Sequence, residues 1–181
     1  MPYPRLYRVI PLIVWLALCF ISGKAAAQQY TADFTAAPTL IDYPGVPFWK
    51  QTAEVTLGGT VYHIVNGGNG GWQHVTSGGN GNSASILYST AATTSVTIRR
   101  QDNAPFTFNG AWLRYTNSTD PTFYPPPYLT VSYVGAAPAV PAETYLGNTT
   151  VTLIKNLTVT AVTFSFSGLL DLYFDNLIVS A

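Results

Sequence analysis

The chain has 181 residues, of which 9% are charged, with eight basic and eight acidic side chains and one cysteine, Cys19. This charge balance gives no support to the basic surface that nucleic-acid binding needs. A single cysteine excludes an internal disulfide and a thiolate-rich metal site. The length is sufficient for a sizeable hydrophobic core without such links.

Residues 1–27 have the pattern of a secretory signal peptide. Arg5 and Arg8 come before an apolar run at 9–21, and small residues follow up to Ala27. We therefore expect cleavage after Ala27. The expected location of the protein is the periplasm or the outside of a bacterial cell.

Two other fates of this segment are less favoured. A membrane-spanning helix needs roughly 20 apolar residues, which is more than the run contains. Lipid modification of Cys19 requires a small residue at the position of Leu18. We therefore expect one domain, residues 28–181, with five basic and eight acidic side chains, no stable membrane contact and a net charge of about −3.

The remaining sequence has the period-two alternation of β-strands, which is clear at 93–99, 128–134 and 161–167. Gly58-Gly59 predicts a two-residue hairpin. Nine to eleven short strands favour an all-β domain, a two-sheet antiparallel β-sandwich with jelly-roll-like connections. Proline-rich stretches at 120–128 and 136–143 predict loops or edge connections, because proline donates no ladder hydrogen bond.

A glycine- and asparagine-rich stretch, residues 65–83, surrounds Trp72. It lacks the lysine and the following helix of a phosphate loop, and it has no carboxylate for calcium. We predict paired turns around a short strand that carries Trp72 to a rim, where Gln73 and His74 supply polar groups. Flexible loops without a ligand are the plainer and more common alternative.

A second tryptophan lies in an alternating segment. There, Ala111, Leu113 and Tyr115 share one face of the expected strand, and Trp112 and Arg114 share the other. If Leu113 faces the core, Trp112 and Arg114 face outward. An exposed aromatic plane beside polar donors suits a sugar ring, although tryptophan in a sandwich is more often part of the core.

No enzyme motif is present in the sequence. His63 and His74 lie on separate segments without zinc-protease spacing, and no serine-hydrolase elbow occurs. Asp171 and Asp175 lie about 13 Å apart on a regular strand, too far for a pair of glycosidase carboxylates. We expect a non-catalytic protein. A hydrolase with carboxylates from different strands stays open as an alternative.

Four segments carry a resemblance to a known group: TTSVTIRRQDNAPFTFNGAWLRY, YLTVSYVG, TVTLIKNLTVTAVTFSFSG and LYFDNLIV. They resemble the exported bacterial jelly-roll domains of the carbohydrate-binding-module-like and galactose-binding-like type, over residues 30–180. Such domains occur in many secreted proteins with PEP-CTERM sorting tails, a tail that this sequence does not show. The resemblance implies binding of an extracellular polysaccharide or envelope glycan.

The resemblance also implies a structural calcium ion where the first and last strands meet. Asp33, Asp171 and Asp175 are the residues that could bind it here; acids that simply face solvent are the alternative. A structural or adhesive envelope or matrix protein without a small ligand is the other functional expectation. Thr-Val-Thr pairs also occur in flat ice-binding faces, but β-branched residues are common on any strand.

The signal peptide generates the first testable prediction. In a bacterial host that expresses the whole gene product, mass spectrometry of the exported protein is expected to find Gln28 as the first residue, because cleavage is expected after Ala27. Exported protein that retains residues 1–27 would contradict this prediction.

Overall fold

The computed structural model describes residues 27–42, 51–68, 71–76, 86–117, 128–146 and 149–180; for residues 68, 86–93, 116, 117, 149 and 168–171 it describes the backbone only. These ranges contain eleven β-strands and no helix, which confirms the predicted all-β sandwich. The expected leader lies outside the described residues, apart from Ala27. In the described ranges, no helix has the length and apolar character to cross a membrane.

The strands are β1 (Gln29–Ala32), β2 (Thr39–Ile41), β3 (Thr52–Leu57), β4 (Thr60–Gly68), β5 (Trp72–Val75), β6 (Ile86–Arg100), β7 (Phe106–Asn117), β8 (Tyr128–Val134), β9 (Glu143–Leu146), β10 (Thr149–Val159) and β11 (Ala161–Ser180). The connection between β8 and β9 contains no strand, as its prolines predict. Most of the other proline-rich stretch, up to residue 127, lies outside the described residues.

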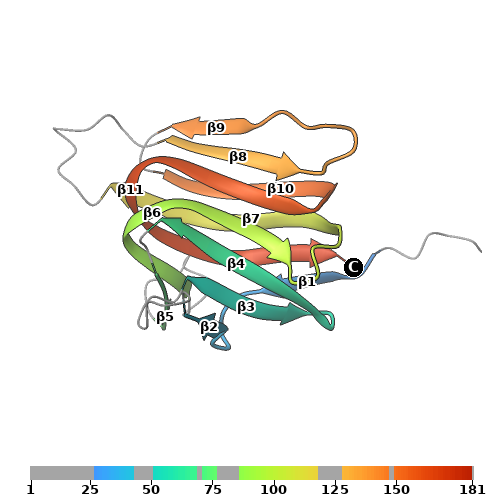
Figure 1. Ribbon diagram of the computed structural model, residues 1–181, viewed down its shortest axis with the longest axis horizontal. Coiled ribbons are helices and arrows are strands. Elements are labelled where there is room, and N and C mark those ends of the chain that lie inside the picture. The colour runs from blue at the N-terminus through green and yellow to red at the C-terminus, as the bar shows by residue number, and fades with distance from the viewer. Residues whose placement is uncertain are drawn as a thin grey trace, which may run out of the picture.

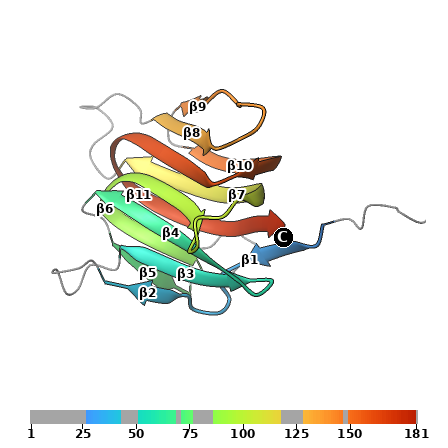
Figure 2. The ribbon, with the colours of Figure 1, turned by 45° about the vertical axis from the view of Figure 1, so that its right-hand side comes forward.

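Two long strands, β6 and β11, run through both layers of the sandwich (Figures 1 and 2). Residues 161–166 of β11 pair with β8, and residues 161–165 pair with the second half of β6. Residues 170–180 pair with β7 and, along part of their length, with β1 and the first half of β6. The larger sheet therefore has the order β9-β8-β11-β6-β4-β3-β2, and the smaller sheet has β10-β7-β11-β6-β5, with β1 beside the end of β11.

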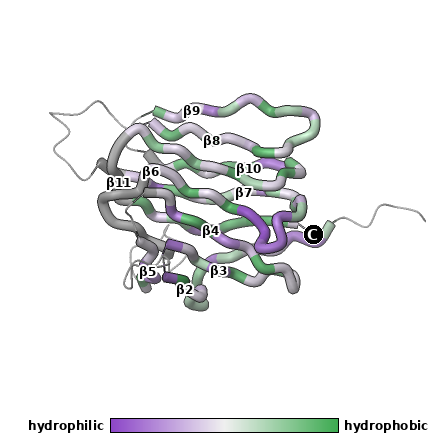
Figure 3. Tube along the Cα trace, viewed as in Figure 1, coloured by the Kyte–Doolittle hydropathy of each residue, from purple (hydrophilic) through white to green (hydrophobic). Residues whose placement is uncertain are grey.

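The core lies between the two sheets and is rich in aromatic rings. Phe174 of β11 is fully buried, and its ring centroid lies 6.2 Å from those of Phe34 and Phe164 and 6.4 Å from that of Trp72. Alternation along β5 and β11 supplies three of these rings, whereas Phe34 lies in the connection between β1 and β2. Figure 3 shows hydrophobic and more polar positions alternating along β8. Burying apolar side chains from both sheets is the main stabilising term of such a sandwich.

The predicted Gly58-Gly59 hairpin joins β3 and β4. Both glycines have positive φ angles, 57° and 77°, which other residues rarely adopt. The ring of Tyr30 packs so closely on Gly58 that a β-carbon there would lie 2.5 Å from it. The hairpin therefore also holds β1 against the larger sheet.

The edge strands β9 and β10 close one side of the sandwich. Lys155 Nζ of β10 donates to Glu143 Oε1 of β9 at 2.5 Å, and the Tyr145 hydroxyl donates to Glu143 Oε2 at 2.7 Å. Burial raises the pKa of Glu143, but the hydrogen bonds from Lys155 and Tyr145 outweigh this effect and hold the pKa below its usual value. Burial and the bond to Glu143 raise the pKa of Tyr145 to about 12.

This cross-sheet ion pair predicts a pH dependence of stability. The folded-state pKa of Glu143 is lowered, so its contribution is complete above the unfolded value near 4.5 and is lost as the pH falls through the folded value. Urea unfolding at about pH 6 and about pH 3 is expected to show a smaller loss of unfolding free energy in Glu143→Gln than in the wild type. At the higher pH the substitution should cost up to about 1 kcal/mol. An equal pH dependence in the two proteins would contradict the assignment.

Candidate functional site

Trp72 lies in the core and not at a rim, so this part of the sequence-based prediction is wrong. Its side chain is 1% exposed, and its indole Nε1 donates to the carbonyl of Ile64 at 2.8 Å. The strand around Trp72 does exist as β5, but pairing with β6 turns the indole toward Phe174. A buried indole needs a partner for its N–H, and the β4 backbone supplies it.

His74, two residues along β5, is also used within the fold. Its Nε2 lies 2.8 Å from the carbonyl oxygen of Phe34. Because a carbonyl oxygen only accepts, this nitrogen carries the proton and donates. The bond ties β5 to the connection between β1 and β2. Gln73, between the two, is exposed and takes the opposite face of the strand.

The predicted alternation in β7 is confirmed. Ala111, Leu113 and Tyr115 belong to the core cluster of the described residues, and Trp112 does not. Trp112 is nevertheless only 5% exposed, so it offers no open aromatic plane. The prediction of an exposed Trp112 is therefore wrong, although the predicted strand face is correct.

Register brings several of the predicted residues together on the outer face of the smaller sheet. Residues directly opposite one another on neighbouring strands point to the same side. Trp112 of β7 is opposite Asp175 of β11, and Arg114 is opposite Tyr173. From Tyr173 the same row continues through position 88 of β6 to Gln73 of β5.

The centre of this row is a stack of Arg114 on Tyr173. The guanidinium carbon of Arg114 lies 4.2 Å from the centroid of the Tyr173 ring. The Arg114 Nε is buried, and in the described part of the chain it has no hydrogen-bond partner. We name Gln73, Arg114 and Tyr173 the stacked-arginine row. Tyr173 was missed at the sequence level, where only the alternation in LYFDNLIV could have placed it on the face of Asp171 and Asp175.

The residues implied for calcium lie in unlike environments. The first and last strands do pair, and Asp33 follows Ala32, which is opposite Leu177. Asp33 is exposed, and hydrogen bonds from the amide and hydroxyl of Thr35, at 3.1 and 2.8 Å, lower its pKa. Asp175 is fully buried and accepts a bond from the Asn176 amide at 2.7 Å.

The described side chains alone do not form a calcium site. No group of three or more His, Cys, Asp or Glu that could hold a metal occurs among them, whereas calcium takes six to eight oxygen ligands. For Asp171 only the backbone is described, opposite Thr116. The calcium site stays a prediction.

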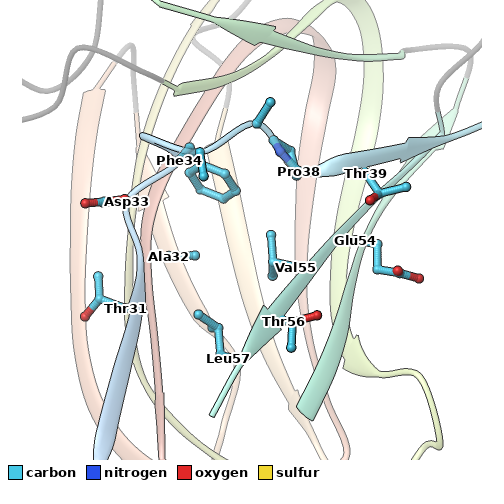
Figure 4. Close-up of a pocket in the computed structure, with 12 residues that line it drawn as sticks. Thr31, Ala32, Asp33, Phe34, Pro38, Thr39, Glu54, Val55, Thr56 and Leu57 are labelled. Atoms are coloured by element: carbon cyan, nitrogen blue, oxygen red, sulfur yellow. The ribbon is translucent and has the colours of Figure 1, made fainter. Parts of the chain in front are cut away.

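A cleft opens where β1 and the β1–β2 connection face β3 (Figure 4). Its volume is about 360 Å³, and Ala32, Leu57, Asp33 and Glu54 are among the residues that line it. The carboxylates of Asp33 and Glu54 lie on opposite sides and point away from each other in Figure 4. Glu54 Oε2 instead lies 3.2 Å from Nε2 of His63. Two carboxylates of one cleft therefore do not converge as an acid–base pair would require.

No protein-family model matches the chain, and no curated protein matches it significantly. The resemblance to carbohydrate-binding-module-like domains therefore stays a prediction based on the quoted segments.

The calcium prediction has a direct thermal test. If the ion binds only the folded state, a hundredfold excess over its dissociation constant stabilises the protein by about 2.7 kcal/mol. For a domain of this size, this corresponds to an increase in melting temperature of several degrees. Melts with calcium and with chelator should differ in the wild type and coincide in Asp33→Asn. Asp102→Asn, at the exposed turn after β6, serves as the control that keeps the difference. Equal wild-type melting temperatures with calcium and with chelator would contradict the predicted calcium site.

Proposed function

We propose that the domain is an exported, non-catalytic module that binds an extracellular carbohydrate on the outer face of its smaller sheet. The observation that carries this proposal is the stack of Arg114 on Tyr173 within a row that extends to Gln73. This row places an aromatic ring and hydrogen-bonding groups on three different strands.

The chemistry of the stacked-arginine row suits a sugar. A guanidinium held against an aromatic ring keeps a fixed plane, and its N–H groups donate in a fixed fork. Sugar hydroxyls accept such bonds, while the amide of Gln73 can both donate and accept. A buried Nε without a partner costs free energy that a ligand hydroxyl or an ordered water can recover.

The second candidate is a structural or adhesive envelope or matrix protein without a small ligand. Two observations favour it: Trp72 and Trp112 are both buried, and the carboxylates of the β1–β3 cleft face away from each other. A structural or adhesive protein would function as a stable folded unit and would not need a ligand-binding pocket. The two candidates differ in whether any soluble or insoluble glycan binds.

The test is depletion of the purified domain by a panel of insoluble polysaccharides, followed by calorimetry with soluble fragments of any that bind. Arg114→Ala is expected to weaken binding about tenfold or more, because a hydrogen bond from a charged donor contributes about 1.5–3 kcal/mol. Tyr173→Ala should weaken it similarly, because it removes the support of the guanidinium.

Arg99→Ala is the matched control, because Arg99 is an exposed arginine of the larger sheet that bonds Asn103. Undiminished binding by Arg114→Ala and Tyr173→Ala would exclude the stacked-arginine row as the site. Absence of binding to every glycan by the wild type would favour the structural protein.

A further inference from the structure

The outer face of the larger sheet carries a two-dimensional array of hydroxyl side chains. Each of the neighbouring strands β6, β11 and β8 contributes two of them, separated by one buried residue. The six residues are Ser95 and Thr97, Thr163 and Ser165, and Thr130 and Ser132. We name them the hydroxyl array.

Register aligns the array into two straight rows. Thr97 is opposite Thr163, which is opposite Ser132. The second row contains Ser95, Ser165 and Thr130, and it continues to Thr144 of β9. The rows follow the strand separation of about 4.8 Å, and they lie two residues, or about 6.7 Å, apart along the strands.

Buried core residues hold the strands of the array in place. Between the two hydroxyls of each strand lies a core residue that is 0% exposed: Val96, Phe164 or Val131. Hydroxyl groups also bond across the array, with 3.2 Å between the Oγ1 atoms of Thr97 and Thr163. Threonine is stiff at its first side-chain torsion. The array is therefore regular in position, and its three threonine side chains are restricted in conformation.

The composition of the array restricts what it can bind. Its two rows contain no charged, amide or aromatic side chain. Among the described residues, the charged side chains Glu54, His63 and Arg99 lie together in the next row of this face. Sugar sites depend on aromatic planes and amides, and the centres of protein interfaces are enriched in aromatic residues, Met and Arg. Neutral hydroxyl and methyl groups at fixed repeats instead match ordered water.

We propose that the hydroxyl array binds the surface of ice. The oxygen atoms of an ice face repeat in two dimensions at separations of this order, so the side-chain hydroxyls can occupy lattice positions while the threonine methyl groups order the water between them. Neighbouring strands rotate by about 20–25°, which restricts a flat contact to about three strands. The expected activity is therefore inhibition of ice recrystallisation and not a large depression of the freezing point.

The test uses the purified domain in an ice-recrystallisation assay and in partitioning into slowly growing ice. The wild type should slow crystal growth and enter the ice. Thr163→Lys and Ser165→Lys should each need an about tenfold higher concentration, because a charge at the contact loses its hydration. Thr158→Lys is the matched control: Thr158 is an exposed threonine of β10 in the smaller sheet, and its substitution should change nothing.

Circular dichroism melts establish that each variant is folded, and Thr163→Val supplies a second test with the methyl groups kept and the hydroxyl removed. Ice that excludes the wild-type protein would overturn the proposal. Equal activity of all lysine variants would overturn it as well, as would a wild-type dimer that Thr163→Lys dissociates. Binding of an insoluble polysaccharide through Thr163 would also overturn the proposal, because the partner of this face would then be a glycan.

Discussion

The register of β11 is the constraint on which the rest of the structure depends. This strand of 20 residues pairs with β1, β6, β7 and β8, and it crosses from one sheet to the other. A slip of one residue would turn Phe164 and Phe174 toward solvent and bring Thr163 and Tyr173 into the core. Burial of the two phenylalanine rings therefore fixes, at the same time, both outer faces of the sandwich.

The two proposed surfaces lie on opposite outer faces of this one scaffold. On the smaller sheet, the stacked-arginine row presents a guanidinium on an aromatic ring; on the larger sheet, the hydroxyl array presents neutral groups at regular intervals. Both are supported by the same core, and the pair of Lys155 and Glu143 closes the side where β9 and β10 form the edges. Side chains on strands that pack on a core are held more precisely than side chains on loops, and both proposed surfaces need such fixed positions.

Much of the fold can be predicted from local patterns in the sequence. Period-two alternation predicts the strands, the Gly58-Gly59 pair predicts a hairpin, and Leu113 correctly separates the inner from the outer face of β7. The position of Trp72 cannot be predicted this way. Trp72 packs against Phe174, which lies about 100 residues further along the sequence, and the glycines beside Trp72 do not indicate this contact. The hydroxyl array cannot be predicted from the sequence either, because its three segments become neighbours only through strand register. The Thr-Val-Thr pairs that are conspicuous in the sequence lie outside the array.

The most direct test of this account is a nuclear Overhauser spectrum of the domain in solution, which measures cross-strand register independently of any ligand. Backbone contacts are expected between Thr163 and Thr97, between Thr163 and Ser132, and between Tyr173 and Arg114. Contacts displaced by one residue on β11, such as Phe164 opposite Thr97, would contradict the arrangement of both faces.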